Sequence, residues 1–196
     1  MATLYYNAAV DTDWNTLGNW WLNSGHTTPA TSLPTSSDSV VASASIGSNS
    51  GSEPTLVDVT LNGSGSLDIS ITFTGSATFN DSAGYDLAGV GATLTGNATF
   101  NDSTVNNGIV NGNATFNDSS YNNSVGSVGA ATFNANSLNY GSVGGAATFD
   151  GSSVNLGTVG GNATFTGNAV NKSGVSGDLI LAYEKGINGS SILGVV

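Results

Sequence analysis

Few side chains in this chain of 196 residues are of the types that catalyse reactions or hold metal ions. The sequence has 13 Asp plus Glu, two Lys, one His and no Cys, so no disulfide, thiolate metal site or cysteine nucleophile can form. The only histidine, His26, lies in a segment rich in Gly, Thr and Pro without an evident partner. It therefore predicts neither a catalytic base nor a metal ligand.

Acidic residues recur at one position of a sequence repeat, where they could pair as general acid and base or bind calcium. Asp81, Asp102 and Asp118 occupy this position, but later copies of the repeat have Ala or Gly there. Asp at such a position favours a turn, and the sequence patterns of EF-hands and calcium-binding nonapeptides are absent. We expect no enzymatic activity and no cofactor, with structural calcium at the Asn-Asp pairs as the alternative.

The charge balance excludes two classes of partner. The formal net charge is −11 and the chain has no Arg, whereas binding to nucleic acid or to an anionic membrane requires clustered cations. No stretch approaches the ~20 apolar residues of a membrane span. The first ten residues have neither a basic region nor a long apolar region, so no signal peptide is expected.

The dominant feature of the sequence is a repeat that begins with Ala-Thr-Phe and has a period of 16–17 residues over most of its length. A unit this short cannot bury a core of its own, so successive units must stack on one another. Short β-rich stretches alternate with Gly and Asn, without a helical pattern. We therefore predict an all-β fold, a parallel β-solenoid (β-helix) capped at both ends. The motif begins at residues 77, 98, 114, 131, 147 and 163.

Side-chain alternation predicts which residues fill the interior. Within Ala-Thr-Phe-Asn, Ala and Phe point to one face of a strand, and Thr and Asn point to the other. Because Phe belongs inside, the repeated Phe residues should form a stack, and two further inward columns should complete a roughly triangular cross-section. The three predicted columns are Phe79, Phe100, Phe116, Phe133, Phe149 and Phe165; Val105, Tyr121, Leu138, Val154 and Val170; and Val110, Val128, Val143, Val159 and Val175.

An Asn follows the second of these columns in every full repeat. Asn tolerates left-handed backbone, and its amide can hydrogen-bond to its counterpart in the next coil. We therefore predict an asparagine ladder at a corner of the solenoid, formed by Asn106, Asn122, Asn139, Asn155 and Asn171. A second corner is predicted where Gly recurs, at residues 112, 129, 144–145 and 160–161.

The two ends of the chain differ from the repeats and divide it into three regions. Residues 1–50 contain all three Trp, and we interpret them as a cap, a docking segment or both, because exposed aromatic residues are typical interface anchors. Residues 51–178 form the predicted solenoid. Residues 179–196 are strongly apolar and are interpreted as a C-terminal cap, with strand exchange or an oligomer contact as the alternative. The docking residues would be Trp14, Trp20, Trp21, Tyr5 and Tyr6.

The outward positions of the repeat favour two kinds of ligand. A regular Thr column beside an Asn column could order water as an ice-binding surface does, although Thr at an outward strand position also follows from strand propensity. Asn, Asp, Thr and scattered aromatic residues such as Tyr85 and Tyr140 also suit carbohydrate. The Thr column consists of Thr78, Thr99, Thr115, Thr132, Thr148 and Thr164.

Two sequence features resemble a known group of proteins. The phrase Trp-Asn-x-x-x-Asn-Trp-Trp at 14–21 is followed by Leu-Pro-x-x-x-Asp-x-Val-Val at 33–41. This phrase and the repeats that begin with Ala-Thr-Phe resemble the repetitive β-solenoid surface proteins of bacteriophage particles and bacterial surfaces.

The resemblance implies a structural or adhesive component and no particular catalytic residue. We expect a non-enzymatic component of a phage or phage-like particle, which decorates a capsid or forms a segment of a fibre or spike. Its expected partners are other virion or surface proteins and carbohydrate, and homo-oligomers are expected, on a virion or an extracellular surface. The alternatives are an adhesin or host-glycan-binding module and an ice-binding solenoid.

Overall fold

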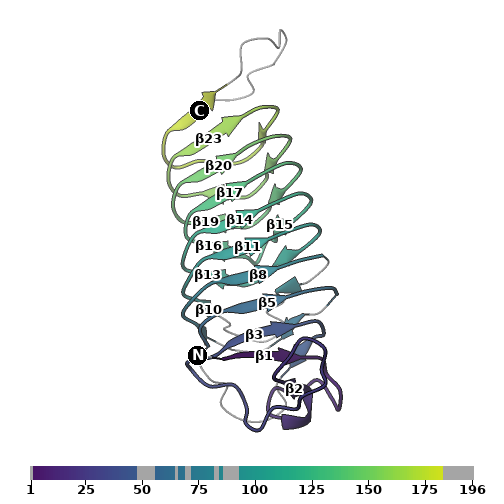
Figure 1. The fold of residues 1–196 in the computed structure, drawn as a ribbon. Coiled ribbons are helices and arrows are strands. Elements are labelled where there is room, and N and C mark those ends of the chain that lie inside the picture. The colour runs from purple at the N-terminus through teal and green to yellow at the C-terminus, as the bar shows by residue number, and fades with distance from the viewer. Residues whose placement is uncertain are drawn as a thin grey trace.

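The computed structural model describes residues 2–47, 56–64, 66–68, 72–81, 84–85 and 93–182. In these residues the chain winds into a parallel β-solenoid of about seven turns, with about 16 residues in each turn (Figure 1). The described part of the chain contains one short 3-10 helix, η1 (Leu17–Asn19). The all-β parallel solenoid that the repeat predicts is therefore confirmed.

The Ala-Thr-Phe motifs form the longest of the sheets, which we call the long sheet. In the described part of the chain it has eleven strands, and all of them run parallel except β2, which pairs antiparallel with β1. In spatial order the strands are β2 (Trp20–Trp21), β1 (Thr3–Tyr6), β3 (Ser39–Ala42), β5 (Val59–Leu61), β8 (Ala77–Phe79), β11 (Ala98–Phe100), β14 (Ala114–Phe116), β17 (Ala131–Phe133), β20 (Ala147–Phe149), β23 (Ala163–Thr166) and β25 (Leu179–Ala182).

Two sheets of shorter strands form the other sides of the solenoid. The Asn sheet consists of β9 (Gly84–Tyr85), β12 (Val105–Asn106), β15 (Tyr121–Asn122), β18 (Leu138–Asn139), β21 (Val154–Asn155) and β24 (Val170–Asn171). The Val sheet consists of β7 (Thr72–Phe73), β10 (Thr93–Leu94), β13 (Ile109–Val110), β16 (Ser127–Val128), β19 (Ser142–Val143) and β22 (Thr158–Val159). A small sheet pairs β4 (Ile46–Gly47) with β6 (Leu67–Asp68).

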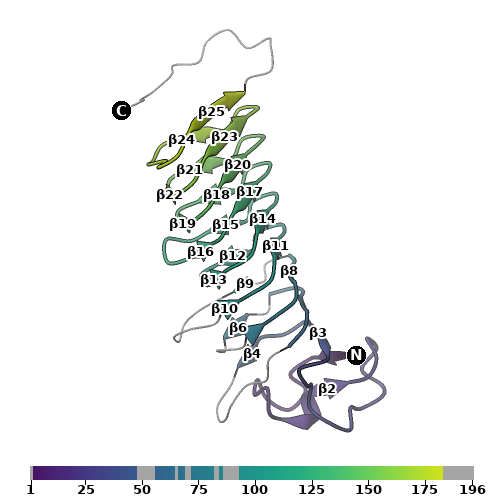
Figure 2. The ribbon, with the colours of Figure 1, turned by 90° about the vertical axis from the view of Figure 1, so that its left-hand side faces the viewer.

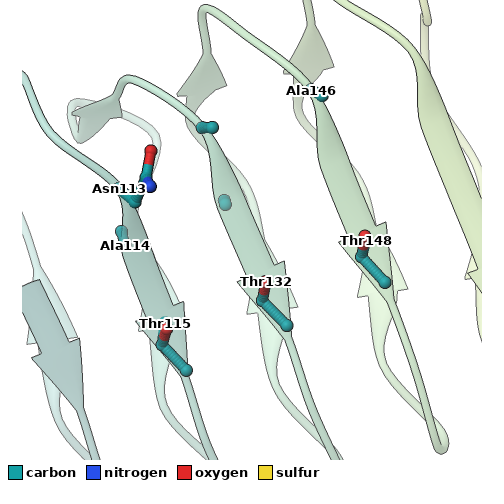
Figure 3. A pocket seen from close by; sticks show the side chains of 8 residues that line it. Asn113, Ala114, Thr115, Thr132, Ala146 and Thr148 are labelled. Carbon is teal, nitrogen blue, oxygen red and sulfur yellow. The ribbon is translucent and has the colours of Figure 1, made fainter.

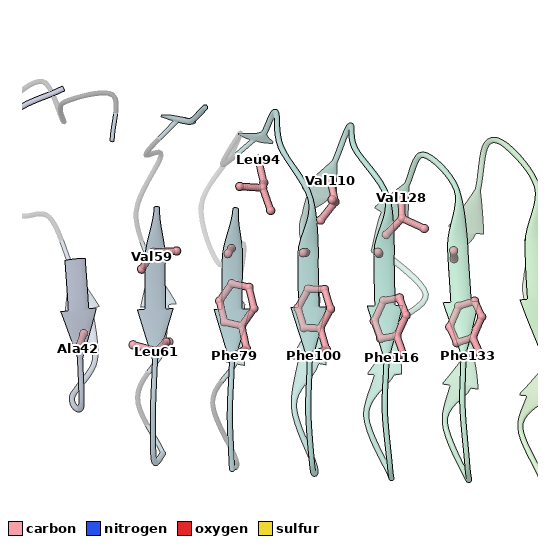
Figure 4. Packing of buried hydrophobic residues seen from close by; sticks show 14 of the residues in the cluster. Ala42, Val59, Leu61, Phe79, Leu94, Phe100, Val110, Phe116, Val128 and Phe133 are labelled. Carbon is pink, nitrogen blue, oxygen red and sulfur yellow. The ribbon is translucent and has the colours of Figure 1, made fainter. Parts of the chain in front are cut away.

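The repeats stack in register, so that each residue lies against its counterpart in the next coil. Phe100 pairs with Phe116, for example, and Phe116 with Phe133. Consecutive rings of the Phe column have centroids 4.6–4.8 Å apart and planes within 3–6° of parallel. All six rings are buried, and Figure 4 shows Phe79, Phe100, Phe116 and Phe133 in line. The predicted Phe stack, from Phe79 to Phe165, is confirmed.

The predicted Val column and glycine corner are also present. Val110, Val128, Val143 and Val159 are buried, and Val175 is partly buried against the core. The recurrent glycines lie at the bend between the Val sheet and the long sheet, where coils approach closely. A Cβ at Gly160 would lie 2.6 Å from the carbonyl oxygen of Gly144 in the adjacent coil.

The prediction of the remaining core column is wrong, because the first residue of each strand of the Asn sheet faces outward. Their first residues, Val105, Tyr121, Leu138 and Val154, are half-buried and Val170 is exposed, whereas the Asn that follows each points inward. A two-residue strand sends only one side chain into the core. The inner position goes to Asn because each amide there finds a hydrogen-bonding partner in the next coil, as described below.

The two ends of the stack are formed by different parts of the chain (Figure 2). At the N-terminal end, β2 pairs with β1 and is the last strand of the long sheet. At the other end, β25 pairs with β23 through Leu179, Ile180 and Leu181. The rest of the predicted C-terminal cap, residues 183–196, lies outside the described residues, as does most of the insertion around Tyr85–Gly91.

Candidate functional site

The outer face of the long sheet is a flat polar surface built from the repeat. The central residue of each motif points outward, and Thr60, which precedes the first motif, continues the same column. These Thr side chains are half-buried, and their strands pair directly, so one hydroxyl follows another from coil to coil (Figure 3). The column is Thr60, Thr78, Thr99, Thr115, Thr132, Thr148 and Thr164.

Beside the Thr column lies a second asparagine ladder that sequence reasoning missed. The side-chain amide of each Asn donates to the side-chain oxygen of the Asn in the preceding coil, at 2.8 Å. The sequence shows the recurrence of Asn two residues after Thr, but it does not show that neighbouring amides bond to one another. This outer ladder consists of Asn62, Asn80, Asn101, Asn117 and Asn134.

The outer ladder changes composition towards the C-terminal end. Asp150 replaces Asn in the next coil, and the hydroxyl of Thr166 donates to its carboxylate at 2.6 Å. This hydrogen bond, followed by one from the backbone of Gly151, lowers the pKa of Asp150 below its ordinary value. A side-chain hydrogen bond between adjacent coils is therefore kept at Asp150 and Thr166.

A shallow depression of about 330 Å³ lies on the same face, across β14, β17 and β20 (Figure 3). It forms where Ala130 and Ala146 take the position occupied by Asn113 in the preceding coil. Thr115, Thr132 and Thr148 line it with hydroxyl groups. The lining is neutral and hydrogen-bonding, without an ionisable group that could act as an acid or base.

The recurring Asp residues form turns. Asp81, Asp102 and Asp118 have φ of 64°, 58° and 58°, in the left-handed region. The Asp81 carboxylate accepts from the backbone N–H of Gly63 at 3.0 Å, and the Asp102 carboxylate accepts from that of Asp81 at 3.1 Å. The carboxylates therefore link successive turns. Among the described residues, no group of three or more His, Asp or Glu side chains is gathered as a metal site.

The predicted asparagine ladder is confirmed, but it lies inside the solenoid. Its amides donate to the next coil at 2.8–2.9 Å, and four of its five members are completely buried. Its residues belong to the Asn sheet, and none of them has the left-handed backbone expected at a corner. This inner ladder runs through Asn106, Asn122, Asn139, Asn155 and Asn171.

Buried glycines follow the inner ladder and allow the coils to approach closely. The Asn106 amide donates to the carbonyl oxygen of Gly108 at 3.3 Å, and its side-chain oxygen accepts from the Gly108 N–H at 3.0 Å. A Cβ at Gly157 would collide with the backbone of Gly141 in the adjacent coil. In the sequence, these glycines are marked by the recurrence of Gly two to four residues after each ladder Asn.

The predicted docking aromatics are mostly interior residues. Trp14, Trp20 and Tyr6 are buried, with ring centroids 4.6 Å apart for Trp14–Trp20 and 4.9 Å for Tyr6–Trp20. The Trp20 indole N–H donates to the Trp14 carbonyl oxygen at 2.9 Å. These three side chains therefore do not present a surface to a partner. Tyr5 and Trp21 are half-buried and lie directly across the β1–β2 pair.

Polar side chains hold the chain around this aromatic cluster. Asn19 is completely buried, and its amide donates to the Asp11 carboxylate at 2.8 Å. That bond, followed by one from the Asp13 N–H, lowers the pKa of Asp11. Burial, with the nearby charges of Asp11 and Asp13, raises the pKa of Tyr6 to about 12. His26 lies against Trp21 with ring centroids 5.9 Å apart, and its own backbone is left-handed, with φ of 51°.

The exposed apolar side chains at this end are different residues from those predicted. They are Val10, Leu17 and Leu22, which flank the buried Trp cluster in sequence. Aliphatic residues gave no docking signal in the sequence, because isolated Val and Leu occur equally in cores and on surfaces.

Comparison of the chain with protein-family models, with curated proteins and with solved structures finds no match. Within the described residues, no helix has both the length and the apolar character needed to cross a membrane.

Proposed function

We propose that the chain is a non-enzymatic structural component of a phage or phage-like particle, in which it serves as a stiff rod attached through one end. The observation that carries the proposal is the continuity of the ladders. Backbone pairing, Phe stacking and two Asn ladders run in register through successive coils. A body built this way resists bending, because bending would disturb several ladders together.

The N-terminal end supplies the attachment surface in this proposal. Val10, Leu17 and Leu22 are exposed there, whereas Trp14 and Trp20 of the same segment are buried and packed together. In this proposal the buried aromatic cluster holds the segment rigid, the exposed apolar side chains dock, and the remaining coils project from the particle. Capsid decoration and a fibre or spike segment both fit a rod fixed in this way.

Attachment can be tested by co-sedimentation with density-banded particles assembled without the protein. Leu17→Asp combined with Leu22→Asp should abolish co-sedimentation, because charges would replace the apolar docking surface. Ile109→Asp is the matched control, since Ile109 is also exposed but lies on the outer face of the Val sheet. Binding that survives the double substitution would contradict attachment through this end.

Ice binding is a second candidate function, favoured by the Thr column on the long sheet. Seven outward Thr side chains lie in register across consecutive strands. A flat array of hydroxyls at the strand spacing of about 4.8 Å could hold water in an ordered layer. Thermal hysteresis that is lost in Thr132→Tyr but kept in Ser142→Tyr, on a different face, would support it. Absence of hysteresis in the native chain would reject it.

A further inference from the structure

The outer face of the Asn sheet has a line of apolar side chains in register. Because each ladder Asn points inward, the residue before it points outward. β12, β15, β18, β21 and β24 follow one another in the Asn sheet (Figure 2), and each pairs in register with the next, so these outward residues lie above one another. We call this column, together with the side chains of Tyr140 and Leu156, the apolar stripe. Its first column is Val105, Tyr121, Leu138, Val154 and Val170.

Tyr140 and Leu156 widen the stripe on the side away from the turns. They are 43% and 39% exposed, two residues beyond Leu138 and Val154. The Tyr140 ring packs edge-on against Tyr121 of the preceding coil, with centroids 6.1 Å apart. Aromatic and aliphatic side chains therefore cover three adjacent coils without interruption. Contiguous apolar patches of this kind mark contact surfaces.

The stripe is free of carboxylates, as are the strands of the Val sheet. Residues 103–107, 119–123, 136–140, 152–156 and 168–172 include no Asp or Glu, and their one charged residue is Lys172. The whole chain has a net charge of −11. Two copies of so acidic a chain repel each other, and the repulsion is weakest where both surfaces lack carboxylates.

We propose that the apolar stripe is a contact surface between two copies of this chain. A second copy offers the same acid-free apolar face, so the contact buries Tyr and Leu without burying a charge. It also has the same coil spacing, which the Phe stack sets at 4.6–4.8 Å. Side chains of one stripe can therefore fit between those of the other over several coils, as few unrelated partners could.

The contact should produce a dimer whose population rises with protein concentration. Sedimentation velocity of the full chain from about 1 μM to about 500 μM covers the expected range of dissociation constants. We expect Leu156→Asp to weaken dimerisation by at least tenfold. The matched control is Ile109→Asp, because Ile109 is 40% exposed on another face. It should dimerise as the native chain does.

A cysteine cross-link tests the same face without adding a charge. Because the chain has no Cys, a single introduced thiol reports on a single position. Leu138→Cys, in the central coil of the stripe, should form a disulfide-linked dimer under mild oxidation. Ser142→Cys, in the same coil but on the outer face of the Val sheet, should remain monomeric. Far-ultraviolet circular dichroism confirms that each variant keeps its β structure.

Four results would overturn the proposal. The native chain could remain monomeric over the whole concentration range. Leu156→Asp could dimerise as strongly as the native chain, or Ile109→Asp could weaken the dimer equally. Equal cross-linking at Leu138→Cys and Ser142→Cys would likewise show that the stripe is not the preferred contact. The proposal does not depend on attachment to a particle, so it can fail or succeed separately from the proposed function.

Discussion

Asn139 and Asn155 are joined side chain to side chain inside the solenoid, with the amide of Asn139 donating to the oxygen of Asn155 at 2.8 Å. Both side chains are completely buried. A buried amide without a partner would destabilise the fold by about 1–3 kcal/mol. Here the side-chain N–H of each of these two Asn residues donates to the next coil, and its side-chain oxygen accepts from the preceding coil. The polar column is therefore compatible with the core.

Replacing one member of this inner ladder by Asp should be strongly destabilising. In Asn139→Asp the new carboxylate cannot donate to Asn155, and ionisation would place a charge inside the solenoid. We expect a loss of about 3–5 kcal/mol at pH 7, as when a buried charge is left unpaired. Urea unfolding followed by circular dichroism measures the loss.

The loss should depend on pH, with a sign fixed by burial. Burial raises the pKa of the new carboxyl above its unfolded value of about 4. The loss of stability relative to the native chain should therefore be smallest below pH 4 and should grow as the pH rises through the folded pKa. Asn134→Asp in the half-buried outer ladder is the control and should lose less. Equal losses at both sites would contradict the distinction between inner and outer ladders.

Shortening one ring of the Phe stack should destabilise the fold through a cavity. Phe116 is completely buried between Phe100 and Phe133. Phe116→Ala or Phe133→Ala should cost about 3–5 kcal/mol of unfolding free energy, as for other buried Phe truncations. Thr115→Ala, on the same strand but pointing outward, should change it much less. A near-neutral Phe116→Ala would contradict the inward packing of the stack.

The sequence predicted the long sheet well because its strands are long enough to show alternation. Ala, Thr and Phe together place one large apolar ring on one face, and repetition aligns the rings. The two-residue strands of the Asn sheet have no such pattern. There, we expected Val105 and Leu138 to face the core because they are apolar, whereas the structure places Asn106 and Asn139 inside. The expectation failed because it ignored hydrogen bonding between coils.

The functional surfaces were harder to predict than the core. The sequence located the Thr column, since outward positions follow from alternation. It did not distinguish packed from exposed aromatic residues, and so it assigned docking to Trp14 and Trp20, which pack against each other. The sequence did not predict the apolar stripe, for a related reason. Its first column, Val105 to Val170, was assigned to the core, and only the inward ladder shows that these residues face outward.

Replacing Gly by Ala should lower the stability of the fold at Gly157, where two coils meet closely, and should leave it nearly unchanged at Gly174. A Cβ at Gly157 would collide with the backbone of Gly141, whereas one at Gly174 would have no atom within 4 Å. We expect Gly157→Ala to lose about 1–3 kcal/mol, as overpacked sites do, and Gly174→Ala to change stability by about 0.5 kcal/mol or less. Thermal unfolding of the two variants gives the comparison, and equal behaviour would contradict the close approach at Gly157.

The N-terminal aromatic cluster should weaken at alkaline pH. The pKa of Tyr6 is raised to about 12, so the folded chain keeps a proton that the unfolded chain loses near pH 10. Stability should therefore be full below pH 10 and fall as the pH rises towards 12. Tryptophan fluorescence follows this end selectively, because all three Trp lie within residues 1–50. Tyr6→Phe should reduce the alkaline loss, and an unchanged loss would assign it to another group.

The most direct test of the central claim is quantitative mass spectrometry of density-banded particles from the culture that produces the protein. A structural component should co-purify with the particles at a fixed, high copy number relative to the major capsid protein. The same ratio should persist through repeated banding. A protein found only on cells or in the medium, and absent from the particles, would contradict the claim.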